Sequence, residues 1–217
     1  MKANIEVESI KGEIEVESKE AQEFLNYIIP EFFKDGIGIV NDLVKSWRWK
    51  NQVKILQKSK QFLEDKKLTA SQVPLKILIP LLEKSSLEED ESLQDRWAKL
   101  LSYASSSKEF EYTKSFINIL EQLTVLEANI LNWMYNEIKQ NSNKNFRIND
   151  VAEQMNIDKE KLKIIYDNFS RLGIVIQKTK GQGISVGSNL SVVNNIRPNG
   201  NFKITSFGIS FLETCEQ

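Results

Sequence analysis

The stretch Pro74–Ser105 reads PLKILIPLLEKSSLEEDESLQDRWAKLLSYAS and predicts two buried helices that are separated by an acidic turn. The first helix, Leu75 to Leu82, is apolar on almost every side, which is typical of a central element. Pro80 lies inside this helix and cannot donate to the carbonyl of Lys76, so we expect a kink there. The pair of helices indicates a mainly α protein.

The second helix of this stretch follows a run of acids and carries one apolar face. Its apolar residues repeat at helical spacing and are Leu93, Trp97, Leu100, Leu101 and Ala104. The segment Ser86–Glu89 matches a capping box, and acids in a first helical turn are favoured by the helix dipole. We expect Asp95 and Lys99 to pair, because they are four residues apart.

Toward the N-terminus, the pattern predicts a helical domain over residues 19–123. A first helix carries the stripe Phe24, Leu25, Ile28 and Ile29, and a longer helix is expected from about Gly38 to Lys66. Residues 1–18 repeat the letters IEVES at 5–9 and 14–18. This segment is interpreted either as a β-hairpin or as an acidic tail, since an isolated hairpin is only marginally stable.

Toward the C-terminus, residues 124–217 predict a second domain with a different order of elements. A helix is followed by a short strand at 146–148, a short helix capped by Asn149, a longer helix capped by Asp158, and two strands at 174–176 and 202–205. The expected buried stripe of the longer helix is Leu162, Ile165, Tyr166, Phe169 and Leu172. Gly173 is expected to end the longer helix, and a closing helix follows from Ser206. This order is typical of a winged helix-turn-helix domain with a small β-sheet wing.

The composition excludes several classes of chemistry. There are no histidines, which removes Ser-His-Asp catalysis, Cys-His catalysis and histidine metal sites. Cys215 is the only cysteine, so the sequence predicts neither a disulfide framework nor a thiolate cluster and fits a reducing cytoplasm. The net charge is −1, and no apolar run is long enough for stable membrane insertion.

The acidic run also suggests an enzyme hypothesis. Glu88, Glu89, Asp90 and Asp95 could serve a metal-dependent nuclease if other elements supplied further ligands. Helix capping explains the same acids without a missing ligand. We therefore predict no catalytic residue, no cofactor and no metal site.

Basic residues of the second domain form a candidate nucleic-acid surface. They are Lys159, Lys163, Arg171, Lys178, Lys180 and Lys203. Residues 125–217 hold eleven basic and nine acidic residues, whereas a DNA-reading module usually shows a clear basic stripe. Binding of duplex DNA through the winged helix stays open on this pattern, and it would be sensitive to salt.

Three segments together resemble the abortive infection alpha family of bacterial proteins. They are Gly38–Arg48 (GIVNDLVKSWR), Pro74–Leu82 and Leu93–Leu101, and the resemblance extends over roughly residues 36 to 205. It implies a role in defence against phage, through death or growth arrest of the infected cell. It implies no catalytic residue.

The family pattern includes Asp95, Arg96 and Trp97. We interpret Asp95 and Arg96 as surface or helix-pairing charges and Trp97 as a core residue. The sequence thus predicts a cytoplasmic, non-enzymatic defence protein that recognises a protein or nucleic-acid partner. The alternative is a winged-helix transcriptional regulator that binds DNA, and self-association into a homo-oligomer also stays open.

Overall fold

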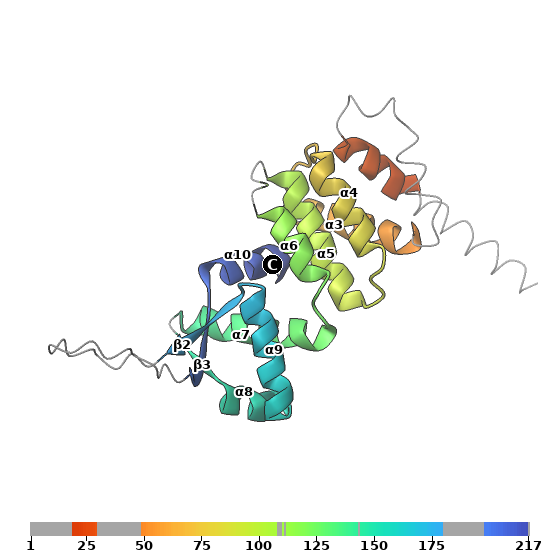
Figure 1. Ribbon diagram of the computed structural model, residues 1–217. Helices are drawn as coiled ribbons and strands as arrows, with labels where there is room; N and C mark the ends of the chain where they lie inside the picture. Colours follow the sequence, from red (N-terminus) through yellow and green to blue (C-terminus); the bar gives the residue numbers. More distant parts are fainter. Residues whose placement is uncertain are drawn as a thin grey trace, which may run out of the picture. The chain divides into compact units, whose positions relative to one another are not determined.

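The computed structural model describes residues 19–29, 49–107, 110, 112–142, 144–179 and 198–216 (Figure 1). The chain divides into two compact units. The helical unit is Met1–Val125 with Thr214–Gln217, and the mixed unit is Leu126–Glu213. The sequence placed all of 124–217 in one domain, whereas here the last four residues group with the helical unit. The expected hairpin or tail over 1–18, and the part of the expected long helix that precedes Trp49, lie outside the described residues.

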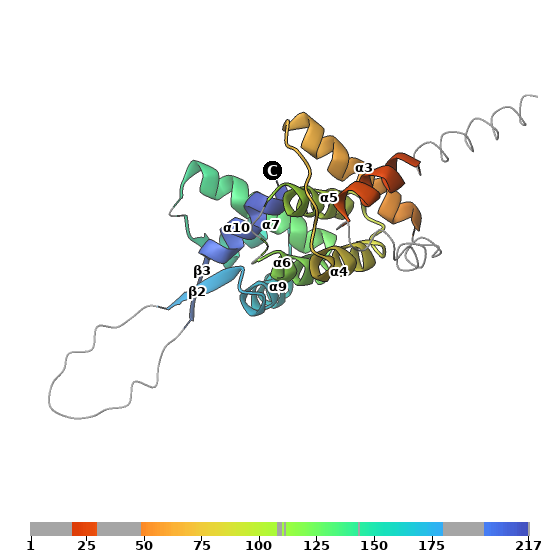
Figure 2. The same cartoon turned by 90° about the horizontal axis from the view of Figure 1, so that it is seen from above.

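The helical unit is built around α5 (Glu91–Ser106). Residues 19–28 are helical, and the other helices are α3 (Trp49–Asp65), α4 (Leu75–Ser85) and α6 (Thr113–Leu120). Helix α5 packs against α3, α4 and α6, as Figures 1 and 2 show. Ten of its sixteen residues are buried, including all five of the predicted apolar face. This central position leaves α5 little solvent-exposed surface.

The first helix and α4 bury the apolar residues that the sequence singles out. Phe24, Leu25, Ile28 and Ile29 are all buried, which confirms the predicted stripe. Helix α4 buries Ile77, Leu78, Leu81 and Leu82, but Ile79 and Pro80 remain partly exposed. The prediction that this helix is buried on almost every side was therefore wrong, because only one of its faces packs inward.

The N-terminal cap of α5 is Asp90, not Ser86. Asp90 Oδ1 accepts hydrogen bonds from the backbone N–H of Ser92 at 2.9 Å and of Leu93 at 3.1 Å. Ser86 ends α4 instead, and its hydroxyl donates to the carbonyl of Glu83 at 2.6 Å. The expected capping box was wrong because the hydroxyl of Ser86 is engaged by α4, while the carboxylate of Asp90 stands directly at the start of α5.

The mixed unit combines helices with a small antiparallel sheet. Its elements are α7 (Val125–Gln140), β1 (Phe146–Arg147), α8 (Ile148–Met155), α9 (Lys159–Arg171), β2 (Val175–Thr179), β3 (Pro198–Ile204) and α10 (Ser206–Glu216), which continues into the helical unit. The strand order is β1-β3-β2, and both pairings are antiparallel. The described residues are thus mainly helical with a three-stranded sheet, which confirms the predicted class in this coarser form.

The inner face of the sheet and the buried face of α9 share one core. Val175 pairs with Ile204 in the register of β2 and β3, and both side chains are buried. Phe202 stacks on Tyr166 of α9 with ring centroids 4.0 Å apart and an interplanar angle of 15°. Burial raises the pKa of the Tyr166 hydroxyl far above its usual value, and this hydroxyl lies 3.6 Å from Met134 Sδ. Of the five predicted stripe residues of α9, Leu162, Ile165, Tyr166 and Phe169 are buried, whereas Leu172 follows the last helical residue and is partly exposed.

The turns around α9 have the backbone conformations that the sequence suggests. Asp158 caps the start of α9, and Gly173 follows its end with a φ of 74°. This angle lies in the left-handed region that glycine adopts without strain. One cap differs, since Asn149 lies inside α8, whose N-cap is Arg147.

The entry into α10 leaves no space for a side chain at Gly208. The N–H of Thr205 donates to the carbonyl of Ile174 at 2.9 Å, and the N–H of Gly208 donates to Thr205 Oγ1 at 2.9 Å. A Cβ atom on Gly208 would stand only 2.3 Å from the carbonyl oxygen of Ile174. The segment after α9 and the start of α10 therefore approach each other as closely as glycine permits.

Within the described residues, no helix is both long and apolar enough to cross a membrane.

Replacing Gly208 by alanine tests this close approach. We expect Gly208→Ala to destabilise the protein by about 2–3 kcal/mol, because backbone must shift to relieve the overlap. Gly200→Ala is the matched control: Gly200 has a φ of 67° but nothing within 4 Å of an added methyl carbon, so only a backbone cost of about 1 kcal/mol is expected. Urea unfolding of both variants measures the difference, and equal losses would contradict the steric explanation.

Candidate functional site

Two places in the structure are candidate sites, and each lies within one unit. The first is the family motif Asp95-Arg96-Trp97 on α5 of the helical unit. The second is the exposed side of α9 in the mixed unit, together with the hollow between α8 and α9.

Trp97 and Asp95 both hold α5 in place. Trp97 is 1% exposed and belongs to the core of the helical unit. Asp95 Oδ1 accepts from Lys58 Nζ of α3 at 2.6 Å, and Lys58 also lies 3.5 Å from Glu91. The predicted pairing of Asp95 with Lys99 was wrong, because Lys58 reaches Asp95 from the neighbouring helix.

Arg96 forms a buried ion pair at the other side of α5. Its Nε lies 2.5 Å from Glu216 Oε1, and the two side chains are only 7% and 10% exposed. Arg96 Nη1 also donates to the carbonyl of Ser92 at 2.9 Å, and Lys99 Nζ donates to the carbonyl of Glu216 at 3.0 Å. Of the two interpretations of Arg96, the helix-pairing charge is therefore correct and the surface charge is not.

Cys215 lies next to this ion pair and is completely buried. Burial raises the pKa of its thiol far above the usual range, and the neighbouring Glu216 carboxylate adds to the effect. The neutral thiol is consequently the stable form near pH 7. Cys215 therefore lacks the solvent access of activated cysteines, and burial outweighs the nearby cations Arg96 and Lys99.

The hypothetical metal ligands do not come together. Asp90 is used as the cap of α5, and Asp95 is paired with Lys58. Glu88 Oε1 accepts from the N–H of Asp90 at 3.0 Å, and the carbonyl of Glu88 accepts from Gln94 Nε2 at 2.8 Å. Across the described parts of the chain, no group of three or more His, Cys, Asp or Glu residues is arranged to hold a metal ion.

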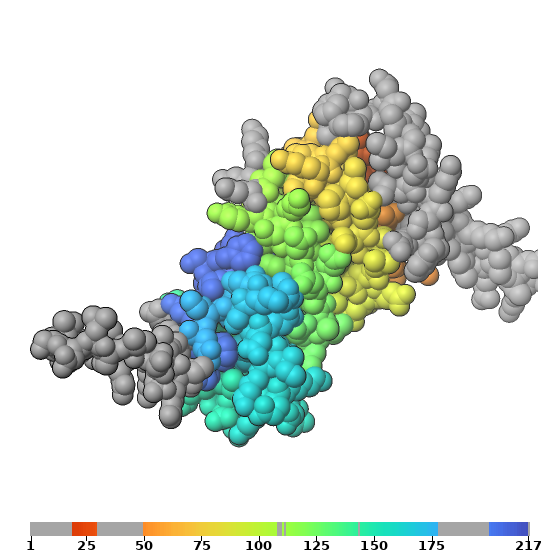
Figure 3. All heavy atoms as spheres, viewed as in Figure 1, coloured from red at the N-terminus to blue at the C-terminus, as the bar shows by residue number. Residues whose placement is uncertain are grey.

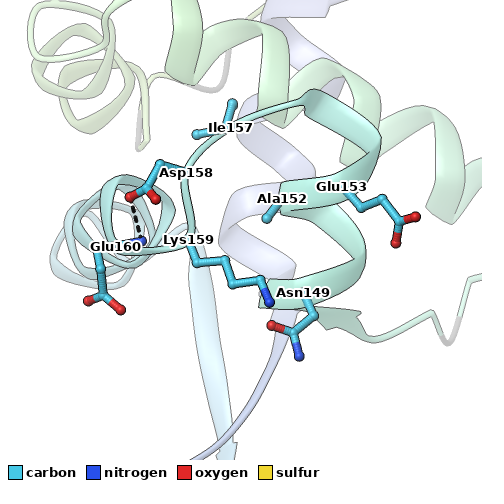
Figure 4. Close-up of a pocket in the computed structure, with 7 residues that line it drawn as sticks. All are labelled: Asn149, Ala152, Glu153, Ile157, Asp158, Lys159 and Glu160. Atoms are coloured by element: carbon cyan, nitrogen blue, oxygen red, sulfur yellow. Dashed lines mark hydrogen bonds between the residues drawn. The ribbon is translucent and has the colours of Figure 1, made fainter.

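An open hollow of about 690 Å³ lies between α8 and α9 in the mixed unit. Its lining residues are Asn149, Ala152, Glu153, Ile157, Asp158, Lys159 and Glu160. Figure 4 shows Lys159 extending across the hollow toward Asn149, while Ala152 and Ile157 supply the apolar part of the lining. The lining contains three acidic side chains and one basic side chain, so its net charge is negative.

The N-terminus of α9 already carries its own anion. Asp158 Oδ1 accepts from the N–H of Glu160 at 3.0 Å and of Lys161 at 3.2 Å (Figure 4 shows the first bond). These N–H groups are the ones that bind a phosphate at a free helix N-terminus. The carboxylate of Asp158 thus takes the position that a DNA phosphate would use.

The structure brings together only some of the six residues that the sequence suggested for nucleic-acid binding. Lys159, Lys163 and Arg171 lie on α9, where Lys163 pairs with Glu160 at 2.7 Å and Arg171 donates to Asn168 at 2.6 Å. Lys203 lies on β3 opposite Ile176. Lys180 and the side chain of Lys178 lie outside the described residues.

Sequence reasoning missed the most exposed apolar residue of α9. Ile164 is 70% exposed, more than any other large hydrophobic side chain in the described residues. Lys161 and Asp167 stand three residues to either side of it, both exposed, and neither has an ion-pair partner among the described residues. The helical pattern did indicate that Ile164 is exposed, because Ile164 falls outside the predicted buried stripe that contains Ile165. We call Lys161, Ile164 and Asp167 the α9 face.

Removing Arg96 tests the buried ion pair. We expect Arg96→Ala to cost about 3–5 kcal/mol of unfolding free energy, because it leaves the Glu216 carboxylate buried and uncompensated. Lys84→Ala is the control, since Lys84 and Glu121 also approach to 2.5 Å but both are 39% exposed. An exposed pair contributes only about 0–1 kcal/mol. Urea denaturation at neutral pH compares the two, and a loss no larger than the control would refute the role of Arg96.

Changing pH tests the cap of α5. The side-chain hydrogen bond from Ser92 and the N–H of Leu93 lower the pKa of the Asp90 carboxyl below its usual value. Its stabilising effect is then present above the unfolded pKa of about 3.9 and is lost as the pH falls through the lowered value. We expect Asp90→Ala to cost about 1 kcal/mol at pH 7 and less near pH 3, while Asp90→Asn keeps most of the cap. Thermal unfolding of the wild type and both variants across this pH range measures the loss of stability. A loss in Asp90→Ala that stays equally large at low pH would contradict a cap by the ionised carboxylate.

Comparison with known proteins identifies the family of this chain. Residues 50–215 match the family described as abortive infection alpha, a range that contains both the motif on α5 and the α9 face. The segment Gly38–Arg48, which also carried the resemblance, precedes the matched range. No curated protein and no solved structure gives a significant match. Because the match covers well over half of the 217 residues, the chain belongs to the abortive infection alpha family.

Proposed function

We propose that this protein acts in abortive-infection defence against phage by docking to a partner, without covalent chemistry of its own. Membership of the family supports the biological setting. The contacts of the motif support the absence of a reaction there, since Asp95, Arg96 and Trp97 are each used to hold α5. The single cysteine fits a cytoplasmic place of action.

In this proposed function, the mixed unit is a winged-helix module. The order α7, β1, α8, α9, β2, β3 and the antiparallel sheet β1-β3-β2 support this assignment. In such a module α9 takes the place of the recognition helix. Winged helices serve as protein-docking units as well as DNA readers. The side chains on the surface of α9 therefore indicate which of these two kinds of partner the module binds.

Exposed Ile164 is the observation that carries the proposal. An isoleucine that is 70% exposed in the middle of a helix offers apolar area to a protein surface. The charges around it are mixed, because Lys161 and Lys163 stand beside Glu160 and Asp167. Mixed charges around an apolar centre are typical of protein interfaces, which have an apolar core and a polar rim.

The surroundings of α9 argue against duplex DNA as the partner. The hollow beside its N-terminus is lined by Glu153, Asp158 and Glu160 against Lys159 alone. Lys163 is neutralised by Glu160, and the N-terminal N–H groups are taken by Asp158. A phosphate backbone would therefore meet carboxylates where a DNA-binding helix presents cations.

Plating of phage on cells that carry the protein tests this function. We expect Ile164→Asp to abolish protection, while Leu87→Asp, which alters a 52% exposed residue of the helical unit, leaves it intact. Both variants place the new charge at an exposed position, so both should remain folded, which circular dichroism checks. Protection that survives Ile164→Asp would refute docking through α9. Tight, steeply salt-dependent binding of duplex DNA by the purified protein would favour the regulator instead.

A further inference from the structure

We propose that the partner of the α9 face is a second copy of this chain, bound with the two α9 helices antiparallel and centred on Ile164. This inference rests on the docking role of α9 proposed above and names the partner. Its basis is the arrangement of charge around Ile164, which is self-complementary.

The positions along α9 set the geometry. Helix α9 has thirteen residues, and Ile164 is the sixth, so it lies close to the middle of a helix about 20 Å long. Lys161 and Asp167 precede and follow Ile164 by three residues, and residues three apart share one helical face. All three side chains are exposed. Figure 3 shows the two units as atoms, with α9 in the light blue part of the surface.

A two-fold axis through Ile164 would place unlike charges opposite each other. In an antiparallel pair, the residue three positions before the centre faces the residue three positions after it in the second copy. Lys161 of each copy would then face Asp167 of the other, with an Ile164–Ile164 contact between the two ion pairs. A parallel pairing would set lysine against lysine and aspartate against aspartate, which disfavours that orientation.

Two neighbouring charges of α9 pair with each other. Glu160 Oε1 and Lys163 Nζ lie 2.7 Å apart. Lys161 and Asp167 have no ion-pair partner in the parts of the chain that the structure describes, so they remain available to the second copy. One pair of short helices buries less than a standard interface of about 1,600 Å², so we expect a weak dimer that depends on concentration.

Charge reversal in two separate variants gives a direct test. Lys161→Glu places two acids opposite each other in each half of the dimer, and Asp167→Lys places two lysines there. We expect each variant alone to raise the dimer dissociation constant by about tenfold or more. A mixture of the two variants restores both ion pairs, because the introduced glutamate of one variant would face the introduced lysine of the other, and it should dimerise like the wild type. Sedimentation equilibrium of the full chain over a range of concentrations measures all three cases.

The outcomes separate this inference from the proposed function. Lys114→Glu, at an exposed position of α6 in the helical unit, is the matched control and should leave dimerisation unchanged. Weakened single variants together with rescue in the mixture support the antiparallel pairing. A wild-type chain that stays monomeric, single variants that dimerise as it does, or a mixture that fails to associate would overturn the pairing. If protection still depends on Ile164 in that event, the proposed docking function stands and its partner is a different protein.

Discussion

Helix α5 has to bury most of its surface, and this constraint governs the helical unit. Three helices pack against it, so side chains on several of its faces leave water. Its apolar residues gain from this burial, but its polar residues need partners. The side-chain amide of Gln94 donates to the carbonyl of Glu88, Arg96 forms an ion pair with Glu216, and the hydroxyl of Ser105 donates to the carbonyl of Ser102. The sequence of α5 is therefore constrained at its polar positions as much as at its apolar ones.

The family motif acquires a physical meaning from this position. Asp95, Arg96 and Trp97 are consecutive, so they point in three different directions from the helix. They contact α3, the end of α10 and the core respectively. Three adjacent residues thus secure one helix on three sides, and this explains a short block of mixed character without invoking catalysis.

Local patterns in the sequence predicted the helices and strands well where one face is buried. The stripes of the first helix and of α5 are buried as expected, and so are four of the five stripe residues of α9. Gly173 adopts the conformation that its place after α9 requires. Prediction failed where a residue outside the recognised pattern takes the expected position. Asp90 caps α5 in place of Ser86, and Lys58 of α3 pairs with Asp95 in place of Lys99. The sites were harder still, because they depend on contacts between distant segments. Arg96 and Glu216 are 120 residues apart, and no periodicity links them.

The burial of Cys215 gives the protein a built-in reporter. It is the only thiol in the chain, and it stands one residue before Glu216 at the end of α10. A thiol reagent can reach it only when this last turn opens, since the side chain is inaccessible in the closed state. The rate at which the reagent consumes the thiol therefore reads out how often the end of α10 leaves α5, without any added label.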